Sequence, residues 1–262
     1  MMRSIYTNYI LKFPRFFKLF IKDIFYLYRT KAPSNVLAAF FIRKYEAIRI
    51  RGKYLEQAGL FKIEKSKLSL SNDWFSSNVP FWFSIIEEYR LDVKSVRVLE
   101  IGSWEGLSSF FILWSLPNSY LTSVDTWQGA DEHKDGTWLP EGVLGNIENA
   151  FDDNLTRYKG RFYKFKGTSH SFFNSEYFNK NYYDLIYVDG SHYSHDVMID
   201  AIKGFEMLKI GGIMIFDDYL WNYYTKSIDN PAIAVNLFLH MKKGSYKIIR
   251  LYYQMVIIKT AE

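Results

Sequence analysis

Residues 96–106 of the chain read VRVLEIGSWEG, and this stretch decides the fold. It holds the apolar residues of a short buried strand, namely Val96, Val98, Leu99 and Ile101. The strand ends in a turn bracketed by Gly102 and Gly106, and a helix is predicted over residues 107–116. Glycine lets the backbone approach a ligand, and the N-terminus of a helix offers free N–H groups. A glycine turn between a strand and a helix is therefore typical of α/β proteins that bind a nucleotide-like molecule.

Strands and helices are predicted to alternate from residue 96 onward. The predicted strands are residues 96–101, 120–125, 161–166, 184–189 and 212–217. The helices predicted between and after them are residues 107–116, 144–157, 171–180, 194–209 and 232–241. Two further strands, 246–252 and 255–259, are expected to form an antiparallel hairpin at the edge of the sheet. Alternation of this kind indicates an α/β fold.

Composition limits the class of protein. With 262 residues, of which 48% are apolar, the chain is long enough for one α/β domain with additions and a sizeable core. It has no cysteine, which excludes disulfides and thiolate metal ligands and fits a reducing compartment. The N-terminus lacks the apolar core and the small-residue cleavage site of a secretory signal. We therefore expect a cytoplasmic protein.

The net charge of +5 is unevenly distributed. Residues 1–31 carry one acid, Asp23, and seven basic residues, Arg3, Lys12, Arg15, Lys18, Lys22, Arg29 and Lys31. This segment is therefore +6, and the remaining 231 residues sum to −1. The basic character belongs to the N-terminal arm rather than to the rest of the chain.

Aromatic residues alternate with these cations over residues 1–30, and helical spacing places the cations on one side of an amphipathic helix. Two interpretations of this arm stay open. It is either a peripheral contact with an anionic surface, such as the inner face of a membrane, or a helix that packs on its own domain or on a second copy in a homo-oligomer. A nucleic-acid partner is not expected, because no binding module accompanies the charge.

Four stretches of sequence come where predicted strands end: VLEIGSWEGLSS at 98–109, SVDTW at 123–127, YDLIYVDGSH at 183–192 and GGIMIFDDY at 211–219. Taken in order, they resemble the motifs of the class I S-adenosylmethionine-dependent methyltransferases. The resemblance covers roughly residues 70–260 and implies a doubly wound, seven-stranded, mostly parallel sheet with an antiparallel edge strand. Such a Rossmann-like fold would belong to an enzyme that transfers a methyl group.

We expect the chain to have three parts. Residues 1–55 would be a basic aromatic helical arm, residues 56–93 a helical lead-in, and residues 94–262 the domain that binds S-adenosylmethionine. Before the first strand, helices are predicted over residues 38–51 and 78–90.

The glycine spacing favours S-adenosylmethionine over a dinucleotide. A dinucleotide needs a further glycine inside the turn so that its pyrophosphate can approach, and here three larger residues separate Gly102 from Gly106. By resemblance, the turn and its Ser103 would line the methionine portion, and Ser108 would hold the methionine carboxylate. Glu100 would either reach the methionine end or brace the turn.

The adenosine portion has its own candidates. Asp125 ends the second predicted strand, where the family places a carboxylate that accepts the ribose hydroxyls; the alternative is an ordinary surface aspartate. One of the next two residues, Thr126 or Trp127, could pack on the adenine. After the third strand, Ser169 and His170 are candidates for reading the adenine edge.

Three carboxylates are expected to converge at the next two strand ends. Asp189 ends the fourth strand, and Asp217 and Asp218 end the fifth. Bare carboxylates would repel and raise one another's pKa, which a hard divalent cation such as Mg²⁺ relieves. The set resembles that of the metal-dependent O-methyltransferases of the catechol and macrolide-sugar type, and the second Asp resembles the sugar-modifying branch. The alternative is that these residues cap helices and form turns without a metal.

His192 lies three residues beyond Asp189, where the catechol-type enzymes carry the base that deprotonates the acceptor hydroxyl. Alternatively, it bonds the backbone of its own turn. His195 and Asp196 are second-choice bases, and Asp189 would position the acceptor and hold the metal.

The function predicted from this set is O-methylation of a hydroxyl on a glycan or small polar metabolite, by S-adenosylmethionine and a divalent cation. The alternatives are a metal-independent methyltransferase of another acceptor, a nicotinamide oxidoreductase, and a non-catalytic cofactor-binding module that docks through its arm.

Overall fold

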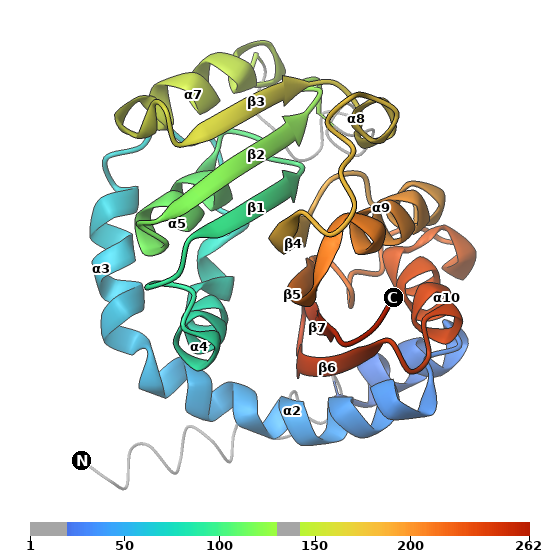
Figure 1. Cartoon of the computed structure of the whole chain (residues 1–262). Coiled ribbons are helices and arrows are strands. Elements are labelled where there is room, and N and C mark those ends of the chain that lie inside the picture. Colours follow the sequence, from blue (N-terminus) through green and yellow to red (C-terminus); the bar gives the residue numbers. More distant parts are fainter. Residues whose placement is uncertain (1–19, 130–141) are drawn as a thin grey trace, which may run out of the picture.

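A seven-stranded sheet runs through the computed structural model, which describes residues 20–129 and 142–262 (Figure 1). The strands lie in the order β3-β2-β1-β4-β5-β7-β6. Their bounds are β1 Val96–Ile101, β2 Ser119–Asp125, β3 Phe162–Lys166, β4 Tyr183–Val188, β5 Leu208–Phe216, β6 Tyr246–Leu251 and β7 Met255–Lys259. The sheet predicted from the sequence is thus confirmed, and its strands differ by a few residues from the predicted ones.

The strand order creates a crevice between β1 and β4. Strands β1 to β5 pair in parallel, and β1 has β2 on one side and β4 on the other. The loops that leave β1 and β4 therefore turn to opposite faces, and ligands of open α/β sheets bind at such a point. The predicted hairpin is also present, because β7 pairs antiparallel with both β5 and β6.

Helices cover both faces of the sheet, which explains why its strands are apolar throughout. Leu99 and Ile101 of β1 join one core with α8 (Ser169–Phe173), α9 (Ser194–Met207) and α10 (Pro231–Met241). Val96 and Val98 join the other core with the helices α3 (Leu55–Lys65), α4 (Val79–Tyr89), α5 (Leu107–Ser115) and α7 (Ile147–Asn154). Side chains of one strand thus pack against the helices on both faces of the sheet.

The N-terminal helices belong to the same body. Residues 20–29 are helical, and α2 (Ser34–Lys53) contacts β6 and α4 at the β6 edge of the sheet (Figure 1). Tyr26 is buried and donates a hydrogen bond to the carbonyl of Trp221 over 2.8 Å, and Asn236 donates to the carbonyl of Thr30 over 3.1 Å. The arm therefore packs on its own domain from residue 20, whereas residues 1–19 lie outside the described residues.

Among the elements whose bounds differ from the predicted ones are β5, α8 and α7. Strand β5 begins at Leu208 instead of residue 212, because the first part of the strand pairs with Tyr183 before a register shift. Helix α8 ends at Phe173 rather than residue 180, and Asn174 caps it by donating to the carbonyl of His170. Helix α7 is shorter than residues 144–157, with single 3₁₀ turns, Leu144–Asn146 and Thr156–Tyr158, on either side.

No helix within residues 20–129 and 142–262 is both long and apolar enough to cross a bilayer.

The crevice depends on the absence of a side chain at Gly102, which we expect to show in a substitution. Gly102 has φ of +86°, and a Cβ atom there would lie 1.9 Å from the carbonyl oxygen of Asp189. Gly102→Ala should therefore lower the free energy of unfolding by about 3 kcal/mol, measured by urea denaturation. Gly59→Ala in α3 is the control, since nothing lies within 4 Å of that site, and it should stabilise by about 0.5–1 kcal/mol. Equal effects of the two changes would contradict the steric argument.

Candidate active site

A cavity of about 1410 Å³ opens at the carboxyl ends of the parallel strands. The loops that follow β1, β2, β3, β4 and β5 line it, together with residues of α2 and of the segment 70–78 before α4. Pockets for a single drug-sized molecule measure about 300–1,000 Å³. This cavity therefore has room for a nucleoside-sized cofactor and a second small molecule side by side.

Glu100 lies beneath the glycine turn and braces it. Its carboxylate is fully buried, does not line the cavity, and accepts hydrogen bonds from the hydroxyls of Ser103 at 2.8 Å, Ser123 at 3.1 Å and Ser109. Burial raises the pKa of Glu100, and the hydroxyl hydrogen bonds partly offset that rise. Of the two roles considered for Glu100, the geometry favours bracing. The hydroxyl of Ser103 is therefore hydrogen-bonded to Glu100 in the interior.

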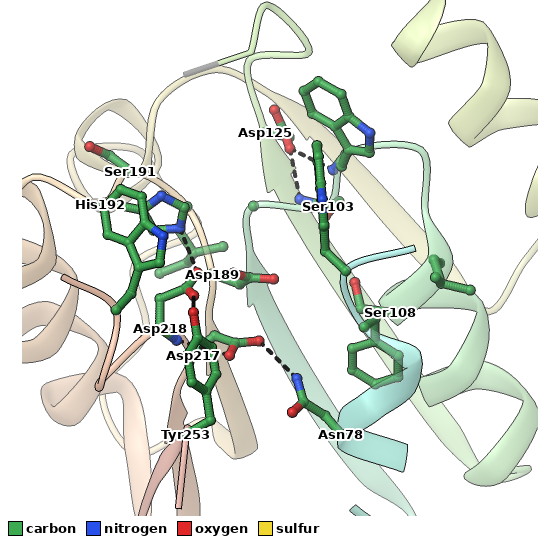
Figure 2. Close-up of a pocket in the computed structure, with 18 of the residues that line it drawn as sticks. Asn78, Ser103, Ser108, Asp125, Asp189, Ser191, His192, Asp217, Asp218 and Tyr253 are labelled. Carbon is green, nitrogen blue, oxygen red and sulfur yellow. Dashed lines mark hydrogen bonds and ion pairs between the residues drawn. The ribbon is translucent and has the colours of Figure 1, made fainter. Parts of the chain in front are cut away.

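Asp125 ties the loop after β1 to the loop after β2. Its carboxylate accepts the backbone N–H groups of Ser103 at 2.7 Å and Trp104 at 2.9 Å (Figure 2). It also accepts the backbone N–H of Trp127 at 2.7 Å. Both tryptophans have left-handed backbones, with φ of 48° and 52°, a strain that these hydrogen bonds help to hold in place. Asp125 also lines the cavity, as its predicted ribose contact requires.

Two more of the predicted cofactor contacts, like Glu100, do not line the cavity. The Trp127 side chain is buried, packs on Phe151 with ring centroids 4.9 Å apart, and donates to the carbonyl of Trp104. Of the two candidates for packing on adenine, only Thr126 therefore lines the cavity. Gly106 caps the N-terminus of α5 with φ of 83° and supports the turn instead of lining the cavity.

The remaining residues predicted to contact the cofactor all line the cavity. They are Gly102, Ser103, Ser108, Thr126, Ser169 and His170. Ser108 lies on the first turn of α5, whose N-terminal N–H groups point at the crevice. Ser169 begins α8, and its hydroxyl bonds to Asp200, a buried residue of α9.

Tyr187 joins two of the three predicted carboxylates. Its hydroxyl lies 2.9 Å from Oδ2 of Asp189 and contacts Oδ2 of Asp217 as well. A hydroxyl has one proton and can donate to only one of these oxygens, so the other contact requires a protonated carboxyl. Burial, and after it the charge of neighbouring carboxylates, raises the pKa of Asp189 well above its usual value and that of Asp217 to about 6. With both contacts made, one of the two carboxyls therefore carries a proton that it donates to the Tyr187 oxygen.

Asp217 is occupied by protein donors. Besides Tyr187, its carboxylate accepts from Asn78 at 3.4 Å (Figure 2). It also accepts from Gln254 at 3.0 Å and from the N–H of Asp218 at 2.9 Å. These contacts use most of its acceptor sites. The prediction that Asp217 is a metal ligand is therefore not supported by this geometry.

Asp218 pairs instead with His192. Nε2 of His192 lies 2.7 Å from one oxygen of Asp218, and the hydroxyl of Tyr253 donates to the other (Figure 2). Burial alone would raise the pKa of Asp218, but the charge and hydrogen bond of His192 outweigh burial and leave that pKa below its usual value. The His192 ring also rests against Trp221, with centroids 4.6 Å apart. His192 thus bonds a carboxylate rather than only the backbone of its own turn.

Asp189, His192 and Asp218 form a cluster that could hold a cation. Each offers one ligand atom, and these atoms lie within 4.8 Å of one another. The set differs from the predicted one, because the imidazole of His192 takes the place of Asp217. Two carboxylates and one imidazole suit Mn²⁺, Fe²⁺ or Zn²⁺ as well as Mg²⁺. The second-choice bases, His195 and Asp196, also line the cavity and lie 3.5 Å from each other.

Sequence reasoning missed the residues that hold these carboxylates. Tyr187 could have been found, because it lies two residues before Asp189 on the same face of the strand. No sequence signal pointed to Tyr253 or Gln254, which reach the cluster from the hairpin between β6 and β7, or to Asn78 before α4.

The family assignment agrees with this geometry. Residues 99–219 match the family model described as a methyltransferase domain. Residues 99–219 form a methyltransferase domain. The matched residues begin in β1 and end just after Asp218, so they include the glycine turn, Asp125 and the cluster.

Solved structures resemble the methyltransferase domain and its N-terminal helices in fold. A Klebsiella pneumoniae protein inferred to be an O-methyltransferase has a TM-score of 0.53 and 15% identity, covering 86% of this chain and 99% of that one. A Staphylococcus aureus protein inferred to be a caffeoyl-CoA O-methyltransferase has a TM-score of 0.51 and 14% identity, covering 82% and 99%. A cofactor-bound protein from MTB has a TM-score of 0.52 and 10% identity, covering 80% and 91%. No curated protein sequence matches the chain at a significant level.

Asp200 should make the stability of the methyltransferase depend on pH. Burial raises its pKa from 3.8 to about 7, and within the described residues no partner reaches its Oδ1. The unfolded chain loses this proton above pH 3.8 while the folded chain keeps it until about pH 7, so this contribution to stability falls as the pH rises through that interval. Asp200→Asn should remove this contribution and raise the free energy of unfolding at alkaline pH by up to about 4 kcal/mol. Urea denaturation at acidic and alkaline pH measures it, and parallel profiles for the two proteins would contradict it.

Proposed function

We propose that the protein transfers a methyl group from S-adenosylmethionine to a hydroxyl of a polar acceptor, a glycan or a small metabolite. One observation carries the proposal: a single cavity has the glycine turn and Asp125 on one side and the Asp189–His192–Asp218 cluster beside it. The cofactor would lie against the turn, and the acceptor would enter from the side of the cluster. Two of the proteins with a similar fold are inferred to be O-methyltransferases, which agrees with transfer to oxygen.

The cofactor side suits a ligand with a zwitterionic end. The N-terminus of α5 offers free N–H groups and a partial positive charge to a carboxylate, and Ser108 adds a hydroxyl there. The carboxylate of Asp125 keeps one acceptor position on Oδ1 after its three backbone hydrogen bonds, which a ribose hydroxyl would fill. A pyrophosphate would find no glycine between Gly102 and Gly106 to admit it.

His192 is the base we propose for the acceptor hydroxyl. It would accept the hydroxyl proton as the acceptor oxygen bonds to the methyl carbon and the carbon–sulfur bond breaks, leaving a neutral thioether. Asp218, 2.7 Å from Nε2, would stabilise the imidazolium that forms. Positioning does the remaining work, because the sulfonium is already activated and the reaction needs the oxygen in line with the S–CH₃ bond in the absence of water.

The acceptor side combines apolar and polar groups. Phe81 and Trp221 offer aromatic rings, while Asn78 and Tyr253 offer an amide and a hydroxyl. Such a lining suits a polar molecule with an apolar ring face. A divalent cation held by Asp189 and Asp218, with the imidazole of His192 left free to act as the base, would supply Lewis acidity that lowers the pKa of a bound hydroxyl.

Binding and transfer measured separately test the proposal. By calorimetry, S-adenosylhomocysteine should bind and NAD should not, and Asp125→Ala should weaken binding at least about ten-fold. The exposed Asp153→Ala is the matched control.

With labelled S-adenosylmethionine and a panel of catechols, sugar nucleotides and polyols, His192→Ala should lower the transfer rate about 10²–10⁴-fold without changing cofactor affinity. Binding of NAD in place of S-adenosylhomocysteine would reject the proposal, and cofactor binding without transfer to any acceptor would favour a non-catalytic module.

The composition of a cation site can be tested by thermal unfolding. Mg²⁺ or Mn²⁺ at about 100 times its Kd should raise Tm by about 5 °C or more. Asp189→Asn and Asp218→Asn should each abolish this shift, whereas Asp217→Asn should keep it, because Asp217 is held by protein donors. No shift in the wild-type protein would favour metal-independent transfer. Loss of the shift in Asp217→Asn would instead support the cation site predicted from the sequence, made of Asp189, Asp217 and Asp218.

A further inference from the structure

The helix at residues 20–29 turns an apolar stripe outwards. Ile21, Phe25 and Tyr28 are 48%, 64% and 71% exposed. They are spaced by four and three residues, so they lie on one face of the helix. Isolated apolar residues on a surface are ordinary, but a stripe of this kind marks an interaction site.

The opposite face holds the helix in place. Tyr26, Leu27 and Thr30 are buried, and Asn236 of α10 donates to the carbonyl and the hydroxyl of Thr30 at 3.1 Å each. The helix lies beside α10 at the blue end of the described chain (Figure 1). Because its inner face is bound to the core, the outward direction of the stripe is fixed.

Basic residues flank the stripe. Lys22 and Arg29 are exposed and seven residues apart, which places them together along one side of Ile21, Phe25 and Tyr28. The one acid of this helix, Asp23, lines the cavity and so faces elsewhere. The outer half of the helix is therefore apolar and basic, in a segment of residues 1–31 that carries a charge of +6.

Helix α2 extends the apolar surface. Phe41 and Ile42 are 53% and 61% exposed, and the ring of Phe41 lies 5.5 Å from that of Phe20 at the start of the helix described above. The arm surface, defined as Ile21, Lys22, Phe25, Tyr28, Arg29, Phe41 and Ile42, thus spans two helices.

We propose that the arm surface docks the protein onto a bilayer of anionic phospholipid. A helix that presents aromatic and aliphatic groups with flanking cations binds in the plane of such a surface, where the rings enter the headgroup boundary and the cations meet phosphate. None of the helices described is long and apolar enough to span a bilayer, which agrees with docking in the plane.

Charge favours this occupant over a second copy of the chain. In a two-fold symmetric pair the same surface meets itself, so Lys22 and Arg29 of one copy would approach those of the other. Like charges brought together oppose association, whereas lipid phosphates neutralise them.

Docking would bring the cavity close to the membrane. Ile48 and Arg51 of α2 line the cavity and are exposed, and they belong to the same helix as Phe41. An acceptor carried by a lipid would then reach the cavity from the membrane surface. This consequence rests on the proposed function, whereas the docking itself does not.

Co-sedimentation of the full chain with vesicles tests the docking. Vesicles of equal parts phosphatidylglycerol and phosphatidylcholine should bind at least about ten times more protein than vesicles of phosphatidylcholine alone. Raising the salt from about 50 mM to about 500 mM should remove most of that binding. The double variants Phe25→Ser/Tyr28→Ser and Lys22→Glu/Arg29→Glu should each bind at least about ten-fold less.

Matched controls lie near the N-terminal ends of strands β4 and β5. Ile210→Ser in β5 and Lys180→Glu before β4 change an exposed apolar residue and an exposed cation, and neither should alter binding. Unchanged Tm in all variants shows that they are folded. Equal binding of the arm and control variants would overturn the proposal, as would salt-insensitive binding. A dimer that the Phe25/Tyr28 variant loses would overturn it in favour of a second copy. This assay does not measure cofactor binding. A failure of the docking prediction would therefore not count against the proposed function, which the calorimetry and transfer assays test.

Discussion

The site depends on a close approach between two loops. Gly102 donates its N–H to Val124 at the end of β2, and Asp189 donates its N–H to Ile101 at the end of β1, so three strand ends are tied together at one point. The Gly102 Cα faces the Asp189 carbonyl so closely that no side chain fits between them. This contact places the cofactor turn and the acidic cluster in one cavity. A wider separation would leave two sites that could not act on one methyl group.

Two acids hold this contact in shape. Glu100 gathers three serine hydroxyls beneath the turn, and Asp125 gathers three backbone N–H groups beside it. Burying the carboxylate of Glu100 costs free energy, and its hydrogen bonds offset part of that cost. The left-handed backbones of Trp104, Trp127 and Asp218 add strain at the same edge of the sheet. In return, the donors and acceptors that meet a ligand are oriented before it binds.

The N-terminal helices serve the cavity and the surface at once. Asp23 and Arg51 line the cavity, while Phe25 and Phe41 of the same two helices face outwards. Tyr26 connects them to the loop after β5 through the carbonyl of Trp221. A partner bound to the outer face would therefore contact the same two helices that form part of the cavity wall.

Local patterns in the sequence determined the strands, the glycine turn at Gly102 and the position of each aspartate at a strand end. Period-two burial and turn chemistry act over a few residues, so they can be read without a structure. The tertiary structure decided which side chains meet. Asp217 is satisfied by Gln254 and Asn78, which lie 37 and 139 residues away in the chain, and His192 joins Asp189 and Asp218 in its place. Trp127 turns into the core, where its ring packs on that of Phe151. Such choices depend on packing and hydrogen bonds between distant segments, which no local pattern contains.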